Sequence, residues 1–331
     1  MKTCSLYFGA LLLILSISTN KLVAQNQKNS SDTEKISSKV EVEVESELAT
    51  TTKTETVDLK VLSWNVQLLP AMYWPLSWRF RSWQYKRINW ISDYLNEQDF
   101  DVIALQEIFT KKMARKMRRK LHKQYPHQIR PKNKRFTLRL SDGVLVVSKL
   151  PIEQIDYVFF DDGYSHDKMA NKGCVLIQGE KEGVPFQLTA THLQSINDSS
   201  ANAVRQSQCQ QIKNALLDPH QQSNVPQLIT GDLNVRKSIE DWYETVLGIL
   251  DAEDYDLNDP RPYTFDNQNY WVQKHPKAHD NVQLDYILLR KNGSQTNIKQ
   301  LTLQRPTKQY KDQTVDYADH YGVIAEIELK R

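Results

Sequence analysis

The feature that most constrains the fold is a series of short apolar segments, each ended by turn or polar residues, that begins after Val57. Residues 59–66 alternate as a strand does, whereas residues 101–109 form the continuous apolar run of a buried strand. The strand candidates are residues 59–66, 101–109, 142–148, 173–179, 186–193, 226–233, 283–289 and 322–329. Helical spacing of apolar residues occurs at 88–95, 111–124, 200–217 and 239–247. Many strands with interspersed helices predict an α/β domain of residues 57–331, with sheets packed between helices.

The first 56 residues differ from this domain in composition. Residues 1–24 have a short positive start, an apolar run at 6–18 and a candidate cleavage site after Ala24, as a secretory signal peptide does. The run is shorter than the ~20 residues that span a membrane, although an uncleaved anchor stays an alternative. Residues 25–56 are rich in Ser, Thr, Glu and Lys, which predicts a disordered linker. We therefore expect a secreted protein with one large folded domain.

Composition and cysteines place few further limits on function. With 40% hydrophobic residues, 25% charged residues and a net charge of +3, the chain has the composition of a soluble globular protein. Cys4 would leave with the signal peptide, so Cys174 and Cys209 remain. In an exported protein these two either form a disulfide or stay buried as free thiols.

Polar residues stand where the predicted strands begin or end. Each alone has an ordinary structural interpretation: Asn65 would be a turn residue, for example, and His192 a core histidine. A layered sheet brings strand termini to one edge, however, so the whole set is better explained as a functional site. The set comprises Asn65, Glu107, His192, Asp232, Asn234, Asp285, Asp319 and His320.

This inventory of side chains suits one kind of chemistry. Carboxylate and amide oxygens are ligands for Mg²⁺, which is usually held by one or two carboxylates. Imidazoles can contact a phosphoryl oxygen or transfer a proton. No clustered cysteines or histidines indicate a structural zinc site. The residues therefore favour a magnesium-assisted attack of water on a phosphate ester.

The motifs SWNV, ALQE, THLQS, GDLN, LDY and DH occur in this order across residues 57–331 and resemble the endonuclease/exonuclease/phosphatase superfamily. The resemblance implies a deoxyribonuclease I-like fold: a four-layered α/β sandwich of two packed β-sheets flanked by helices. It also implies an enzyme that uses one or two Mg²⁺ ions. By motif position, Glu107 would bind the metal with help from Asn65 and Asp319.

The same resemblance implies roles for the other polar residues at the strand ends. Asp232 and Asn234 would orient or deprotonate the attacking water. His192 would stabilise the phosphoryl oxygens in the transition state. His320, oriented by Asp285, would be the acid/base group.

Further stretches, among them NVQLLP, DGVLVVSKLPI, NKGCVLI and YTFDNQN, resemble the secreted neutral sphingomyelinases. That resemblance implies hydrolysis of sphingomyelin to ceramide and phosphocholine at a phospholipid membrane surface. It places Asp142 and Lys172 at the substrate, with Lys172 paired to Asp167. Lys172 as a solvated turn lysine is the alternative. Tyr270 and Trp271 are candidates to contact choline, because aromatic faces attract quaternary ammonium groups.

The sequence leaves the segment that contacts the membrane open. Some haemolytic members of this group carry an aromatic hairpin before the final DH, but residues 291–318 contain only Tyr310 and Tyr317 as aromatics. An aromatic stretch at residues 71–83 could serve instead, with Trp74 and Trp78 at the headgroup boundary. The same aromatics could equally fill a core beneath a loop.

A competing substrate is nucleic acid. Residues 111–135 contain 12 Lys and Arg and no acidic residue. Such a face is usually solvated, but it could also bind anionic lipid or a nucleic-acid backbone. The second hypothesis is therefore a secreted, Mg²⁺-dependent deoxyribonuclease or another phosphodiesterase of the same superfamily. A non-catalytic adhesion module is a third, although it would be expected to lose some of the polar residues. We expect a monomer in each case.

Overall fold

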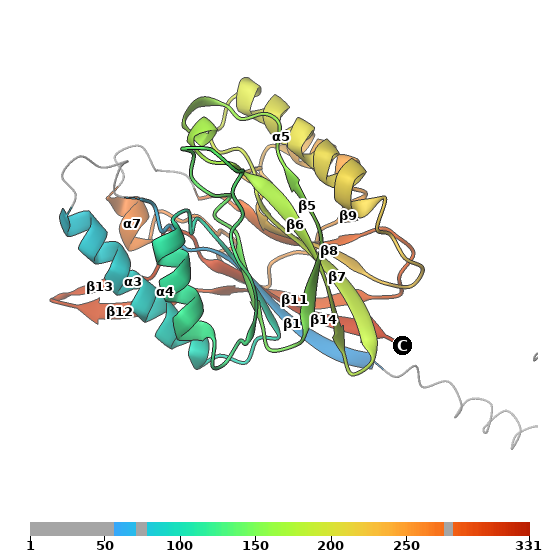
Figure 1. The fold of residues 1–331 in the computed structure, drawn as a ribbon, viewed down its shortest axis with the longest axis horizontal. Helices are drawn as coiled ribbons and strands as arrows, with labels where there is room; N and C mark the ends of the chain where they lie inside the picture. The colour runs from blue at the N-terminus through green and yellow to red at the C-terminus, as the bar shows by residue number, and fades with distance from the viewer. Residues whose placement is uncertain (1–55, 71–77, 275–280) are drawn as a thin grey trace, which may run out of the picture. The chain divides into compact units, whose positions relative to one another are not determined.

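Two six-stranded β-sheets pack face to face in the unit of residues 56–331, and helices cover their outer faces (Figure 1). The computed structural model describes residues 56–70, 78–274 and 281–331. The first sheet has the order β11 (Asn297–Gln304), β14 (Gly322–Lys330), β1 (Thr56–Asn65), β2 (Val102–Gln106), β4 (Leu145–Ser148) and β3 (His127–Ile129). The second has the order β5 (Ile152–Phe159), β6 (Gly173–Lys181), β7 (Val184–His192), β8 (Gln227–Asp232), β10 (Asp285–Arg290) and β9 (Ala252–Glu253).

The helices lie on opposite outer faces. The first sheet is covered by α3 (Trp78–Asn96) and α4 (Lys111–Leu121). The second is covered by α5 (Ser199–Ile212), which continues as a π-helical turn over Lys213–Leu217, and by α6 (Glu240–Leu250). Two short helices, a 3₁₀ turn over Ser165–Met169 and α7 (Tyr270–Gln273), lie between strands. None of the helices in the described part of the chain has the length and apolar character needed to cross a membrane.

Local sequence signals explain where helix α4 begins and which face it buries. Thr110 precedes α4, and its side-chain oxygen accepts a hydrogen bond from the backbone N–H of Met113. Met113, Met117 and Leu121 recur at helical spacing and are buried against the first sheet. The cationic side chains of α4 are left on its outer face.

The core is divided by the sheets into three layers. In β1, Leu59 and Val61 point into the layer between the sheets, whereas Leu62 and Trp64 point outward beneath α3 and α4. The second half of this strand is therefore buried on both faces, whereas Thr56 and Asp58 near its start are exposed, as its alternating sequence indicates. Helix, sheet, sheet and helix form four layers, so the predicted sandwich is confirmed.

Strand direction and register bring the polar strand ends to one edge. β1 runs parallel to β2 with Asn65 beside Gln106, and β7 runs parallel to β8 with His192 beside Asp232. β10 is antiparallel to β8, so its first residue, Asp285, also lies beside Asp232.

All eight predicted strand segments and the four helical ones are present. The sequence reading missed β3, β5, β9 and β11, which are short or only partly buried and so show weak periodicity. It also missed the two-stranded hairpin β12 (Thr307–Tyr310) and β13 (Gln313–Asp316). Cys174 and Cys209 are buried free thiols, which resolves the open alternative. Residues 1–55 lie outside the described residues, so the signal peptide and linker stay predictions.

Gly231 gives a test of how β7 and β8 are aligned. Its φ is +148°, and an added Cβ would lie 2.1 Å from the backbone oxygen of Thr191, beside His192. We expect Gly231→Ala to destabilise the protein by roughly 1–3 kcal/mol, since the backbones must separate. Gly248→Ala is the control, because its Cβ meets nothing within 4 Å in helix α6. The control should be neutral or slightly stabilising in denaturant unfolding; equal stability of both variants would contradict this packing.

Candidate active site

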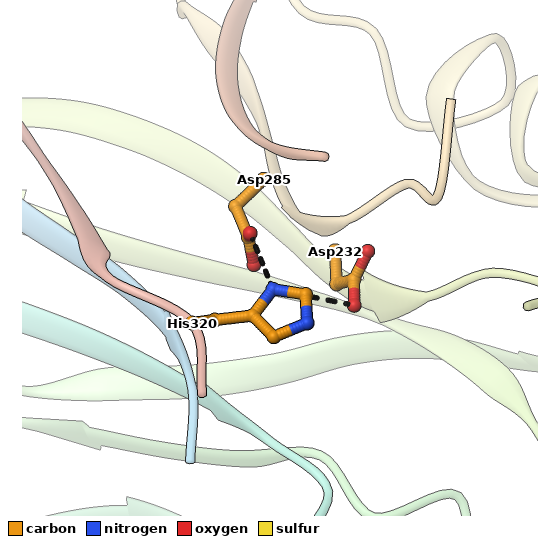
Figure 2. A group of neighbouring side chains, drawn as sticks. All are labelled: Asp232, Asp285 and His320. Atoms are coloured by element: carbon orange, nitrogen blue, oxygen red, sulfur yellow. Dashed lines mark hydrogen bonds and ion pairs between the residues drawn. The ribbon is translucent and has the colours of Figure 1, made fainter. Parts of the chain in front are cut away.

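Two buried polar contacts join the sheets at the edge where the strand ends meet. The side-chain amide of Asn65, at the end of β1, donates a hydrogen bond to Asp232 Oδ2 at the end of β8, at 2.9 Å. His320, just before β14, has its Nδ1 2.7 Å from Asp285 Oδ2 at the start of β10 (Figure 2). Each contact has one partner in each sheet, so the edges of both sheets build a single site.

The backbone around the site adopts unusual conformations. Gln67, Glu107 and Asn234 have φ values of +48°, +65° and +53°, in the left-handed region that side chains other than Asn and Asp rarely adopt. Such residues persist where the surroundings fix them, and they cluster at functional sites. At Asn234, the backbone N–H donates to Asp232 Oδ1 at 2.9 Å, which fixes the second oxygen of that carboxylate.

Glu107 and Asp319 form an acidic pair at this edge. Burial and then the nearby Asp319 carboxylate raise the pKa of Glu107 to about 7, against the opposing effects of His320 and Asn65. Burial likewise raises the pKa of Asp319, whose Oδ1 is buried without a hydrogen-bond partner. A divalent cation would stabilise the charged forms of two such buried carboxylates, one of which has an oxygen without a hydrogen-bond partner. Hard oxygen donors without thiolates suit Mg²⁺, so Glu107 and Asp319, with the Asn65 amide, fit this metal.

His320 is held in its charged form. Burial alone would lower its pKa, but the carboxylates of Asp285 and Asp232 and the hydrogen bond to Asp285 raise the pKa well above the ordinary value. The edge of its ring packs against Phe265 with the ring centroids 5.2 Å apart, and its backbone oxygen accepts a hydrogen bond from Trp64 Nε1. His320 is therefore a fixed imidazolium that can donate a proton.

Asp232, Asp285 and His320 also have ligand atoms within 4.8 Å of one another, so they could hold a metal ion themselves (Figure 2). His320 Nδ1 is paired with Asp285 at 2.7 Å, a contact that suits a proton donor and would also orient Nε2 toward a metal ion. We assign Mg²⁺ to Glu107 and Asp319 because they offer carboxylate oxygens alone, which this ion prefers.

His192 is in the opposite state. It is buried, and its Nε2 lies 3.3 Å from Lys172 Nζ and 3.6 Å from Asp232 Oδ2. Burial, and then the charge of Lys172, lower the pKa of His192 to about 3. The lowered pKa of His192 suits the predicted hydrogen-bonding group, and the raised pKa of His320 suits the predicted acid.

Lys172 is buried and paired, which excludes the solvated-turn alternative. Its Nζ lies 2.9 Å from Asp167 Oδ2 and 2.7 Å from the backbone oxygen of Leu193. Although burial opposes it, the Lys172 charge, together with His192, lowers the pKa of Asp167 well below its usual range. The predicted Asp167–Lys172 pair therefore exists, and it contacts His192; its role at the substrate stays a prediction.

The remaining predicted residues make other contacts. Asp142 is buried and accepts hydrogen bonds from the backbone N–H groups of Lys132 and Val144 and from Tyr157 Oη. These bonds fix a loop, and its substrate role stays a prediction. Trp74 and the side chain of Trp78 lie outside the described residues. Tyr270 and Trp271 join an aromatic cluster with Trp83 rather than the buried histidines.

Sequence reasoning missed two residues that position the acidic pair. The side-chain amide of Gln67 donates to Asp319 Oδ2 at 2.5 Å. Arg87, buried in α3, donates to the backbone oxygens of Val66, Gln67 and Tyr317. Gln67 directly follows the SWNV motif, and this position could have identified it. Arg87 has no such signal, because its helix contains several other cationic residues.

Comparison with known proteins agrees with this geometry. The model of the endonuclease/exonuclease/phosphatase family matches residues 62–301. Sphingomyelinase C 2 of Leptospira interrogans is 30% identical over 296 residues, which cover 82% of this chain and 46% of that protein. Phospholipase C of Staphylococcus aureus is 30% identical over 303 residues, covering 82% and 88%. The chain thus spans about half the length of the Leptospira relative and most of the staphylococcal one.

Solved structures give the same result. A variant of beta toxin from Staphylococcus aureus with bound magnesium ions superimposes with a TM-score of 0.68 and 25% identity, covering 82% of this chain and 99% of that one. The comparison agrees with the deoxyribonuclease I-like sandwich and with a divalent-cation site in that relative.

The acidic pair predicts a pH dependence of Mg²⁺ binding. Glu107 has a pKa of about 7 in the metal-free protein and must lose its proton to bind the ion. The apparent affinity should therefore weaken about tenfold for each pH unit below 7 and change little above pH 8. Titration calorimetry in buffers of different ionisation enthalpy measures the released proton.

Glu107→Gln is the matched control. It should bind Mg²⁺ more weakly and release fewer protons on binding. An affinity of the unmodified protein that stays constant from about pH 6 to pH 8 would show that Glu107 is already ionised or does not bind the metal.

Proposed function

The chain belongs to the endonuclease/exonuclease/phosphatase family, and we propose that it is a secreted, Mg²⁺-dependent phosphodiesterase that hydrolyses sphingomyelin to ceramide and phosphocholine. The observation that carries the chemistry is the pair of buried histidines on either side of one Asp232 oxygen, with His192 Nε2 3.6 Å and His320 Nδ1 3.9 Å from Oδ2. The preference for sphingomyelin is supported by relatives whose names state sphingomyelinase or phospholipase C activity.

The proposed reaction is the attack of water on the phosphorus atom. Asp232, with both oxygens oriented by Asn65 and Asn234, orients the water and accepts its proton. His192 donates a hydrogen bond to a phosphoryl oxygen from Nδ1–H of its neutral ring, because Nε2 accepts from the Lys172 ammonium group and Nδ1 has no other partner. His320, held by Asp285, gives its proton to the departing ceramide oxygen, so the bond from phosphorus to that oxygen breaks as the bond to water forms.

When bound, Mg²⁺ would offset the negative charge that develops on the phosphoryl oxygens. Glu107, Asp319 and Asn65 would hold it. Lys172, 3.3 Å from His192, adds a buried positive charge beside the same position and keeps the histidine neutral. The site thus combines fixed charges with one proton donor, as phosphoryl transfer requires.

Nucleic acid is the second candidate substrate because helix α4 presents a cationic face. Lys111, Lys112, Arg115 and Arg119 are exposed on this helix while its apolar side faces the sheet. A cationic helix is equally suited to phosphates of lipid headgroups, so it does not distinguish the two substrates.

The histidines give a direct test of the proposed roles. His320→Ala and His192→Ala should each lower the rate by at least about 10²-fold, since a positioned acid or hydrogen-bond donor contributes that much. Circular dichroism and thermal unfolding check that the variants remain folded. Losses of tenfold or less in both variants would show that the two side chains are structural core residues.

The substrate is tested by comparing lipid with DNA. The purified protein with Mg²⁺ should release phosphocholine from sphingomyelin liposomes far faster than it nicks plasmid DNA. Asp232→Asn is the control, because it must abolish whichever activity belongs to this site, whereas a contaminating nuclease would persist. DNA cleavage that disappears in Asp232→Asn, with no phosphocholine released by the unmodified protein, would establish a nuclease instead.

A further inference from the structure

Three large apolar side chains are strongly exposed among the described residues, and two share one loop. Phe136 and Leu138 have relative exposures of 105% each, and Met169 has 41%. Isolated exposed apolar residues are common, but a fully exposed Phe two residues from a fully exposed Leu is not. Phe136 also has a φ of +53°, which a bulky side chain avoids unless the surrounding structure requires it. We name residues 130–139 the basic loop.

The basic loop surrounds its apolar tip with cations. It contains Arg130, Lys132, Lys134, Arg135 and Arg139, and no acidic residue occurs between residues 111 and 141. Lys134, Arg135 and Arg139 are exposed beside the tip. At its base the loop contacts the buried Asp142, whose Oδ1 accepts a hydrogen bond from the backbone N–H of Lys132, and Asp161 and Asp162 line the neighbouring hollow with Arg139. Apolar groups ringed by cations complement a surface with an apolar interior and negatively charged groups outside it.

The base of the basic loop is fixed to the segment that carries the Asp167–Lys172 pair. The backbone N–H of Leu140 donates to Met169 O at 2.8 Å, and that of Asn171 donates to Leu140 O at 2.9 Å. The side-chain amide of Asn171 donates to Asn133 Oδ1, and the amide of Asn133 donates to Arg139 O. The small hollow beside Arg139 is also lined by Asp167 and Lys172. The tip therefore has a fixed position relative to these residues of the site.

The β12–β13 hairpin, in contrast, does not present its aromatic side chains outward. Tyr310 packs against Trp83 and Trp90 with ring centroids 4.8 and 5.5 Å apart. Tyr317, just after β13, packs against Trp90 and Tyr94. These rings attach the hairpin to α3. The residues between the two strands are Lys311 and Asp312, which are charged and exposed.

We propose that the basic loop docks the protein on a phospholipid bilayer, with Phe136 and Leu138 inserted among the acyl chains and the surrounding cations on headgroup phosphates. This proposal rests on the proposed function in one respect, namely that the substrate lies in a membrane. It places the hollow with Asp167 and Lys172 at the headgroup level beside the inserted tip. Docking by this loop orients the site toward a lipid phosphate.

Vesicle binding without hydrolysis tests the proposal. Vesicles of phosphatidylcholine and phosphatidylglycerol, without sphingomyelin and in the presence of a chelator, are sedimented with the full chain. Phe136→Ala/Leu138→Ala should weaken binding on the order of 10²-fold, about tenfold for each side chain that no longer inserts. Gln309→Ala/Thr314→Ala in the hairpin is the matched surface control and should bind as the unmodified protein does. Equal binding by both double variants would overturn the proposal.

A spectroscopic readout shows which element enters the bilayer. In a Cys4→Ser background, a thiol label reports on Leu138→Cys or on Thr314→Cys, because Cys174 and Cys209 are fully buried. A polarity-sensitive label should shift to shorter wavelength with vesicles at Leu138→Cys and not at Thr314→Cys. The reverse result would assign docking to the hairpin and overturn the proposal.

The two proposals fail separately. If the label at Leu138→Cys inserts but sphingomyelin is not hydrolysed, docking stands and the proposed substrate is wrong. If sphingomyelin liposomes are hydrolysed equally by the unmodified protein and by Phe136→Ala/Leu138→Ala, the proposed substrate stands and docking by this loop is wrong.

Light scattering after size exclusion tests whether the tip contacts a second copy of the chain instead. If the unmodified protein is a dimer, and Phe136→Ala/Leu138→Ala is a monomer with unchanged vesicle binding, the tip is a dimer contact and the docking proposal is overturned.

Discussion

Two buried contacts between the sheets determine the geometry of the site. Asn65 to Asp232 and His320 to Asp285 each join a residue of one sheet to a residue of the other, and all four side chains are less than a tenth exposed. A buried polar group without its partner costs about 1–3 kcal/mol, so sheets shifted relative to each other would pay this penalty at both contacts. The apolar core alone would permit several alignments of the two sheets, and these polar contacts favour the alignment that assembles the site.

Burial and the neighbouring charges set the pKa of each group at this edge. Asp285 and Asp232 raise the pKa of His320 in spite of its burial, whereas burial and then Lys172 lower the pKa of His192. Glu107 and Asp319 are left with raised pKa values and an unused oxygen, which a divalent cation would satisfy. The position of each residue at a strand end thus places three groups at one edge of the sandwich: a proton donor, a neutral hydrogen-bond donor and a cation site.

The sequence predicted the parts that depend on strong periodicity or on motifs. The doubly buried β1 and the strand-end residues Asn65 and Asp232 fall in this class, because a buried strand fixes where its last side chain lies. Arg87 could not be predicted, since its role depends on backbone oxygens brought to it by tertiary packing. Phe136 was overlooked because sequence does not show whether an apolar residue in a cationic loop is buried. The hairpin at 307–316 was missed because its strands are mostly exposed and polar.

The protonation states of the two histidines test the account most directly, because they determine the proposed chemistry. Nitrogen-15 NMR of the imidazoles at pH 7, in the metal-free protein, distinguishes a charged ring from a neutral one. We predict that His320 gives the spectrum of an imidazolium and His192 that of a neutral ring, and that Asp285→Asn makes His320 neutral. A neutral His320 in the unmodified protein, or two histidines that both titrate near the ordinary value, would contradict the assignment of acid and hydrogen-bond donor.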